Sequence, residues 1–279
     1  MLLRRCHSIA IQFSTWPPPR PRPRPRDPIT MNSFAISSPP RSTVHALCFS
    51  AGSSDSEPDE QFTSKQGPLK PGLYLVGTPI GNLEDITFRA LRVLKSANVV
   101  LSEDTRHSGK LLRHYNIKTP LLSYHKFNEC QREQVVLRRL QDGEIVALIS
   151  DAGTPGISDP GTELAKLCVD KGISVIPVPG PSALLTALSA SGLPTNEFTF
   201  VGFLPKHAGT RRERLMVSAN STATQVFFVP PHKLCQFLEE ASSIFDQSRR
   251  CVIAREMTKL HEEPKKYSQP AYQRVKSHS

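Results

Sequence analysis

A loop-forming stretch runs from Ser150 to Gly161 and reads Ser-Asp-Ala-Gly-Thr-Pro-Gly-Ile-Ser-Asp-Pro-Gly. It follows the apolar run Ile145–Ile149 and precedes a helix-like segment over 162–171. Because these residue types propagate neither helix nor strand, the stretch predicts a shaped loop at the carboxyl end of a strand. Ligands of open α/β sheets bind at such ends. Taken alone, the stretch fits an ordered connection without a ligand equally well.

The same pattern of a short apolar run, a Gly- or Pro-containing loop and an amphipathic segment recurs along the chain. It predicts strands over 73–76, 99–101, 120–124, 145–149 and 173–178, with helices between them. Strands that alternate with helices indicate an α/β fold whose mostly parallel sheet is covered on both faces. We therefore expect a first αβα domain over residues 70–191.

A second unit begins after the hinge-like sequence Gly192-Leu-Pro-Thr195. Strands are expected over 198–203, 224–229 and 251–255, and helices from Thr210 and over 231–242. This unit, residues 192–263, is shorter than expected for a complete αβα domain. Residues 264–279 lack an apolar period and predict a basic, disordered tail.

Composition limits the function classes. The chain of 279 residues carries a formal charge of +10, but residues 70–263 hold 23 basic and 20 acidic side chains, so the net charge is weak evidence for a nucleic-acid partner. Apolar runs are too short for a membrane helix, so we expect no membrane association. The six cysteines form no Cys-x-x-Cys pair, which argues against a zinc site and a disulfide framework.

The first 69 residues are expected to be a transit peptide and a disordered leader. Residues 1–53 contain one acid, Asp27, against seven arginines, and no continuous apolar core follows the opening arginines. The Ser-rich sequence from Met31 is typical of chloroplast leaders, whereas the start at Met1 is more typical of mitochondrial ones. We expect a chloroplast location, with the mitochondrion, or both through two starts, as the alternative.

Three Gly/Pro loops follow predicted strands, at Gly77–Asn82, Ser150–Gly161 and Pro179–Ala183. The first lacks the Gly-x-Gly-x-x-Gly spacing of dinucleotide sites and the Lys-Ser/Thr of a phosphate-binding loop. These loops therefore suit a ligand that backbone groups hold and that needs little phosphate-type charge compensation. S-adenosylmethionine is compatible with that description, although the loops do not require it.

Six motifs in order carry a family resemblance: Gly77–Thr87, Glu103-Asp-Thr-Arg106, Ser123–Glu129, Ser150–Gly161, Pro179–Ala183 and Gly202-Phe-Leu-Pro205. Over residues 70–263 the chain resembles the ribosomal RNA small-subunit methyltransferase I family, of the tetrapyrrole-methylase-like (class III) fold. The resemblance implies S-adenosylmethionine-dependent 2′-O-methylation of a cytidine in 16S-type rRNA of the small ribosomal subunit. It also implies a homodimer of two-domain chains with the donor bound between the domains. Members of this family continue further to complete the second domain, so the resemblance implies that this domain is truncated here. The strand Cys251–Arg255 is then expected to be an unpaired edge.

The resemblance implies a donor site on the three loops and on one strand of the second unit. The cofactor-binding residues expected from it are Gly77, Pro79, Ile80, Gly81, Asp151, Ala152, Gly153, Ile157, Ser182, Ala183, Phe228, Val229 and Pro230.

Catalysis is expected from Glu103, Asp104 and Arg106, with Asp104 as the proton acceptor and Arg106 as an anion anchor. An internal Asp104–Arg106 ion pair that braces the loop explains the same residues equally well. A basic rim formed by Lys206, Arg211, Arg212 and Arg214 suits an rRNA backbone, and a solvated helix face explains it nearly as well. No metal site is predicted. A tetrapyrrole or corrin methylase, and a truncated non-catalytic form, remain as alternatives.

Overall fold

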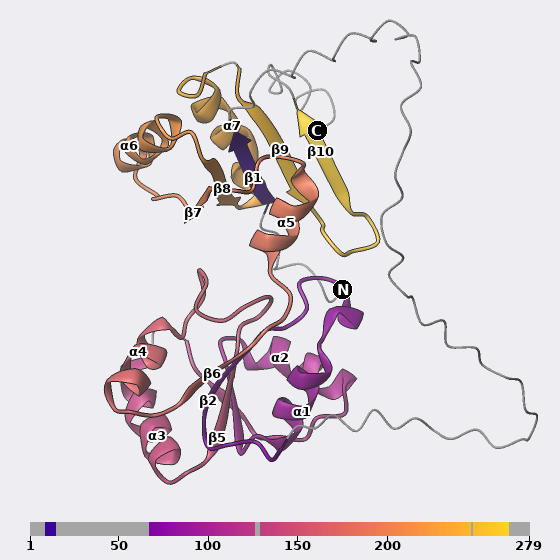
Figure 1. Cartoon of the computed structure of the whole chain (residues 1–279), viewed down its shortest axis with the longest axis vertical. Helices are drawn as coiled ribbons and strands as arrows, with labels where there is room; N and C mark the ends of the chain where they lie inside the picture. Colours follow the sequence, from indigo (N-terminus) through magenta and orange to yellow (C-terminus); the bar gives the residue numbers. More distant parts are fainter. Residues whose placement is uncertain (1–8, 15–66, 126–128, 247, 268–279) are drawn as a thin grey trace, which may run out of the picture. The chain divides into compact units, whose positions relative to one another are not determined.

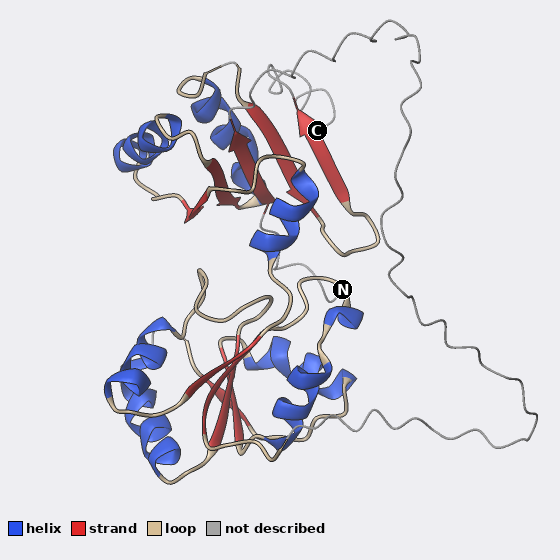
Figure 2. Cartoon of the chain, viewed as in Figure 1, coloured by secondary structure: helices blue, strands red, loops and turns tan. Residues whose placement is uncertain are grey.

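A computed structural model describes residues 9–14, 67–125, 129–246 and 248–267. From Leu69 onward these residues, together with the strand at 9–14, belong to one compact unit that contains two five-stranded sheets. Both sheets are covered by helices (Figures 1 and 2). The predicted α/β class is confirmed.

The first sheet has the strand order β4-β3-β5-β2-β6, and every neighbouring pair in it is parallel. Its strands are β2 (Gly72–Val76), β3 (Val99–Ser102), β4 (Leu121–Ser123), β5 (Ile145–Ile149) and β6 (Val175–Val178). Parallel strands end at the same edge, so the segments that follow β3, β5, β2 and β6 emerge side by side in that order.

Helices cover both faces of this sheet because successive strand residues point to opposite sides. Tyr74 and Val76 pack with α1 (Phe88–Ser96) and α2 (Thr105–His114), whereas Leu73 packs with α3 (Glu129–Gln141) and α4 (Thr162–Asp170). A short 3-10 helix, η1 (Leu83–Asp85), precedes α1. The first half is therefore an αβα sandwich, as predicted (Figure 2).

The second sheet has the order β10-β9-β1-β8-β7 and is mixed: β7 and β8 are parallel, and the other pairs are antiparallel. Its strands are β1 (Ile9–Ser14), β7 (Phe198–Phe203), β8 (Thr224–Val229), β9 (Arg250–Arg255) and β10 (Glu263–Tyr267). One face packs on α6 (Ala208–Ala219) and α7 (Leu234–Ser242), which follows the 3-10 helix η2 (Pro231–Lys233). On the other face, Ala187 of α5 (Ala183–Ser191) packs with Ala254 and Met257.

Three expectations are wrong: the unpaired edge at β9, the disorder of residues 9–14 and the disorder of residues 264–267. Strand β9 is not an edge, because it pairs with β1 on one side and with β10 on the other. Residues 9–14 of the expected leader form the strand between β8 and β9, with Ile11 in register with Phe227 and with Ile253. Residues 264–267 of the expected tail belong to β10. Pairing on both sides satisfies the backbone groups of β9 that a truncated sheet would have left open.

Candidate active site

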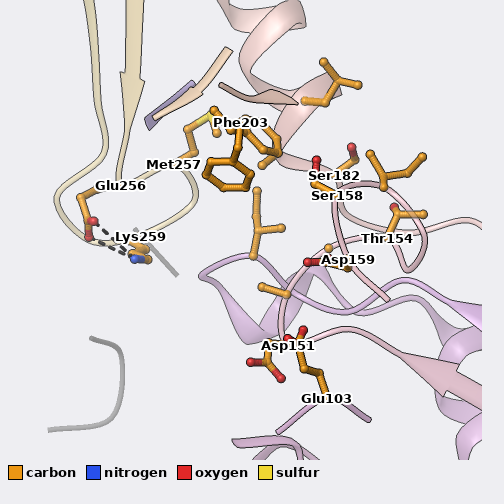
Figure 3. A pocket seen from close by; sticks show the side chains of 17 residues that line it. Glu103, Asp151, Thr154, Ser158, Asp159, Ser182, Phe203, Glu256, Met257 and Lys259 are labelled. Carbon is orange, nitrogen blue, oxygen red and sulfur yellow. Dashed lines mark hydrogen bonds and ion pairs between the residues drawn. The ribbon is translucent and has the colours of Figure 1, made fainter. Parts of the chain in front are cut away.

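A cavity of about 230 Å³ lies at the carboxyl edge of the first sheet. Figure 3 shows its lining, which comes from both sheets of the compact unit. The lining residues are Ile80, Glu103, Asp151, Ala152, Gly153, Thr154, Ile157, Ser158, Asp159, Ser182, Ala183, Leu184, Phe203, Phe228, Glu256, Met257 and Lys259. Loops that follow β2, β3, β5 and β6 thus meet around one space.

Backbone hydrogen bonds hold the loops after β2 and β5 together. Thr78 and Gly153 exchange two N–H···O bonds of 2.9 Å each, and the Thr78 hydroxyl donates to the carbonyl of Ser150 at 3.2 Å. Thr154 Oγ1 donates to the carbonyl of Pro181 at 3.2 Å, which connects the β5 loop to the β6 loop. These contacts fix the loops after β2, β5 and β6 relative to one another.

The helix α5 begins at the cavity. Its N-cap residue is Ser182, whose side chain makes no capping hydrogen bond and lines the cavity. A helix start offers free backbone N–H groups and a partial positive charge, both of which suit a carboxylate. The start of α5 can therefore hold the carboxylate of an amino-acid-like ligand.

One side of the cavity is acidic, and Figure 3 draws the carboxyl groups of Glu103, Asp151 and Asp159 there. Burial, with the nearby charges of Glu103 and Asp151, raises the pKa of Asp159 to about 6. Burial also raises the pKa of Asp151, although its Oδ1 accepts a hydrogen bond from the Asp104 N–H at 3.1 Å. Negative charge in this place can stabilise a positively charged ligand.

Asp104 does a structural task beside the cavity. It is the N-cap of α2, and its Oδ1 accepts the N–H groups of Arg106 at 2.9 Å and His107 at 3.4 Å. Burial by itself would raise the pKa of Asp104. The backbone hydrogen bonds and the Arg106 guanidinium outweigh it, so the pKa is lowered. The Arg106 Nε lies 3.5 Å from the same oxygen, so the expected Asp104–Arg106 ion pair is present. Neither side chain lines the cavity.

The second sheet closes the cavity with aromatic, apolar and charged groups. Phe203 and Phe228 form an edge-to-face pair with ring centroids 5.6 Å apart. An ion pair of 3.2 Å joins Lys259 to Glu256, which has a positive φ of 53°. Such an aromatic wall suits a flat ring, and the positive φ is a strained conformation of the kind found at functional sites.

A second hollow of about 220 Å³ shares Phe203 and Phe228 with the cavity. Lys206, Arg211, Val229, Pro230 and Lys233 are among its lining residues. Arg211 donates two hydrogen bonds to Glu240, of 2.7 and 2.6 Å, and Arg214 donates to Ser218 at 2.9 Å. Arg211 and Arg214 are thus engaged within the fold, whereas Lys206 and Arg212 are exposed.

Comparison with known proteins identifies the family. The family model of the tetrapyrrole (corrin/porphyrin) methylases matches residues 72–268. The chain belongs to the tetrapyrrole methylase family. Within this family it is 49% identical over 192 residues to ribosomal RNA small subunit methyltransferase I of Vibrio cholerae, an alignment that covers 69% of this chain and 67% of that protein. The Synechocystis protein of the same name is 48% identical and covers 68% of each chain. The expected family resemblance is confirmed.

Solved tetrapyrrole methylases share the fold. Cobalt precorrin-4 methyltransferase aligns with a TM-score of 0.56 over 74% of this chain and 89% of its own, at 19% identity. A uroporphyrin-III C-methyltransferase from Thermus thermophilus, solved with S-adenyl homocysteine, aligns with a TM-score of 0.50 over 74% of this chain and 91% of its own, at 22% identity. The class III fold is therefore confirmed.

The structure brings many of the predicted residues of this methylase to one place. Nine line the cavity: Ile80, Glu103, Asp151, Ala152, Gly153, Ile157, Ser182, Ala183 and Phe228. Gly77, Pro79 and Gly81 lie in the β2 loop outside its lining, and Val229 and Pro230 line the second hollow. Their roles as donor-binding residues stay predictions.

Several side chains of this methylase site were not predicted from the sequence, chiefly Asp159, Phe203, Met257 and Lys259. Asp159 lies within the predicted loop Ser150–Gly161, and Phe203 lies in the motif Gly202-Phe-Leu-Pro205. Met257 and Lys259 follow β9 and reach the cavity only through the fold.

The described residues include neither a membrane-spanning helix nor a metal-binding cluster. No helix among them is long and apolar enough to cross a membrane. Within the same ranges, no group of three or more His, Cys, Asp or Glu side chains could hold a metal ion.

Proposed function

We propose that this chain transfers a methyl group from S-adenosylmethionine to RNA of a small ribosomal subunit. The observation that carries the proposal is the cavity at the ends of β2, β3, β5 and β6 in a chain 49% identical to a ribosomal RNA small subunit methyltransferase I. The methylase family supplies the reaction type, and this relative's name supplies the substrate class.

The cavity supports the donor assignment residue by residue. The start of α5 at Ser182 suits the donor's carboxylate, and the Phe203–Phe228 wall suits its adenine. The carboxylates Asp151 and Asp159 suit its sulfonium charge. The bound donor supplies the activated methyl group, and the chain's own residues orient it.

The acceptor is proposed to be the 2′ hydroxyl of a cytidine in the decoding region of 16S-type rRNA. The support is the resemblance of motifs such as Glu103–Arg106 and Ser150–Gly161 to that family of ribose methyltransferases. Exposed Lys206 and Arg212 are proposed to contact the rRNA backbone.

A second candidate is methylation of a tetrapyrrole or corrin. The observation in its favour is the fold that the chain shares with cobalt precorrin-4 methyltransferase. An identity of 19% supports the fold alone, whereas the rRNA methyltransferases are near 48% identical. The rRNA substrate is therefore the better supported one.

The deciding experiment mixes the purified full chain with labelled S-adenosylmethionine and either small ribosomal subunits or uroporphyrinogen III. We expect label in the rRNA, at a decoding-region cytidine and resistant to alkaline cleavage at its 3′ side. Label in the tetrapyrrole alone would support the second candidate. Donor binding without transfer to either would favour a non-catalytic form.

Location and assembly are proposed from the leader and the resemblance. The arginine-rich, acid-poor sequence of residues 1–53 supports import into a chloroplast, or into a mitochondrion from the Met1 start. Reporter fusions of residues 1–65 and 31–65 test both starts, and a cytosolic signal from both would contradict import. A homodimer is proposed from the resemblance, and sedimentation equilibrium of the full chain would reveal a monomer if this is wrong.

A further inference from the structure

Two hollows of the molecule meet at Asp159. The donor cavity of about 230 Å³ adjoins an outer hollow of about 350 Å³, and both are lined by Glu103, Ser158 and Asp159. A transfer reaction needs its donor and its acceptor to approach one another from two sides. The residues that the two hollows share mark the place where the two reactants would meet.

The chemistry of the outer hollow favours a hydroxyl group. Its lining adds Glu163 to Glu103 and Asp159, so three carboxyl groups face it. Carboxylates accept hydrogen bonds from hydroxyls and repel phosphates. A ribose can therefore enter here, while its phosphates must lie elsewhere.

The loop geometry holds Asp159 in a fixed position. Ser158, directly before it, has a φ of 67°, and Gly161 has a φ of 121° with room for no side chain, since a Cβ there would lie 2.4 Å from Leu148 Cδ2. Thr162 Oγ1 donates to the carbonyl of Gly156 at 3.2 Å, which joins the start of α4 to the middle of the loop. A proton acceptor needs such a fixed position.

The environment of Asp159 also suits proton transfer. Burial and the charges of Glu103 and Asp151 raise its pKa to about 6. A general base works best when its pKa lies near the operating pH, and this value is closer to neutral pH than that of an ordinary carboxyl group. Asp104 is less suited to accept the proton, because backbone hydrogen bonds occupy its Oδ1 and its side chain lies outside the lining of the cavity.

We propose that Asp159 is the proton acceptor of the methyl transfer and that Glu103 positions the acceptor hydroxyl beside it. This inference rests on the proposed function. The hydroxyl O–H bond breaks and its proton goes to a carboxylate oxygen of Asp159, while the hydroxyl oxygen forms a bond to the methyl carbon. The S–CH₃ bond breaks and its electron pair stays on sulfur, which leaves neutral S-adenosylhomocysteine. The proton then leaves through the outer hollow.

The first test measures turnover and binding of the Asp159→Asn variant of the full chain. Turnover should fall by about 10²–10⁴-fold, while the Kd for S-adenosylhomocysteine stays within about threefold of the wild type. Asp159→Glu should restore part of the turnover. The matched control is Asp170→Asn, an exposed carboxylate at the end of α4, which should turn over like the wild type. Turnover of Asp159→Asn within tenfold of the wild type would overturn the proposal.

The second test needs no acceptor. As Asp159 ionises between pH 5 and 7.5, the sulfonium donor should gain up to about tenfold in affinity relative to S-adenosylhomocysteine, and Asp159→Asn should abolish most of this gain. Other charged or titratable groups near the site can also change the donor affinity with pH, so the assignment rests on the difference between the wild type and the variant. These groups are Glu103, Asp104, His107, Asp151, Glu163, Glu256 and Lys259.

The two tests separate two kinds of failure. If the wild type methylates no small subunit but shows the gain and the variant loses it, the acceptor is misassigned and Asp159 still faces the methyl group. If the wild type and the variant show the same pH dependence, the assignment of Asp159 is wrong whatever the acceptor is.

Discussion

Gly77 and Gly180 lie against one another at the ends of β2 and β6, where a Cβ on either residue would be 3.0–3.1 Å from the other's Cα. The atoms in the way belong to backbone, which cannot rotate aside. We expect Gly180→Ala to force the β2 and β6 loops apart and to cost about 1–3 kcal/mol of stability. The Kd for S-adenosylhomocysteine should rise about tenfold or more, as calorimetry can measure.

Gly109 offers the matched control within α2. A Cβ there would meet only Leu121 Cδ2 at 4.0 Å. Gly109→Ala should therefore stabilise the chain by about 0.5–1 kcal/mol and leave donor binding unchanged. Equal donor affinity in both variants would contradict the view that the Gly77–Gly180 contact shapes the site.

Asp104 caps α2, so its substitutions should separate structure from chemistry. Asp104→Ala should lose about 0.5–2 kcal/mol in urea unfolding, while Asp104→Asn, which keeps a capping oxygen, should lose little. A loss of turnover beyond 10²-fold in Asp104→Asn, with donor binding retained, would return the role of proton acceptor to Asp104.

The ionisation of Asp159 should make folding stability depend on pH. Its pKa is about 6 in the folded chain against an ordinary value of 3.8, so the folded chain keeps a proton that the unfolded chain has lost between these values. The stability that this carboxyl contributes is complete below about pH 4 and is lost as the pH rises through 6. Asp159→Asn should thus raise the free energy of unfolding by about 1–3 kcal/mol at pH 7.5 and by little at pH 4. Urea unfolding at both pH values measures this difference in the free energy of unfolding between variant and wild type. The same difference at pH 7.5 and at pH 4 would contradict the prediction.

The basic side chains of α6 and its preceding loop should fall into two groups. Lys206→Ala and Arg212→Ala remove exposed charges, so each should weaken binding to small-subunit rRNA and reduce the slope of log K against log salt by about 1. Lys166→Ala, an exposed lysine of α4, is the control. Arg211→Ala should instead cost about 1 kcal/mol of stability, because it breaks two hydrogen bonds to Glu240. Identical salt slopes for all four variants would exclude this basic rim as the rRNA contact.

The strand β1 should hold the second sheet together. Ile11→Pro removes a backbone donor opposite Phe227 and Ile253, whereas Ile11→Val keeps it. In the proline variant, amide exchange in β8 and β9 should speed up tenfold or more, while β2 and β5 keep their protection. Unchanged exchange in β8 and β9 would show that they do not depend on β1.

The strands of the first sheet could be predicted from the sequence because their signals are local. Apolar runs such as Ile145–Ile149 end in Gly/Pro loops, and amphipathic segments separate them. The pairing of β1 gives no such signal, since its partners β8 and β9 lie more than 200 residues further along the chain. Long-range pairing of this kind is decided by tertiary packing.

The candidate site was predictable where loops carry it and hidden where contacts carry it. Gly153 and Ser182 lie in loops that composition alone marks as unusual. The raised pKa of Asp159 depends on its burial and on the charges of Glu103 and Asp151. Asp151 lies in the same loop, but Glu103 follows a different strand, β3, and comes near Asp159 only when the sheet forms. Sequence spacing does not indicate that Glu103 and Asp159 are neighbours.

The place of β1 sets a conflict between import and folding. A polypeptide that starts at Met31, or one that a processing protease cuts anywhere beyond Ser14, lacks the six residues that join β8 to β9. Its second sheet would be divided into the pairs β7-β8 and β9-β10. Each pair would have an edge of unpaired backbone N–H and C=O groups facing the gap. The uncut precursor and the processed product would therefore be two different folding problems, and the product would have to close the gap by moving β9 onto β8 or by accepting a strand from another chain.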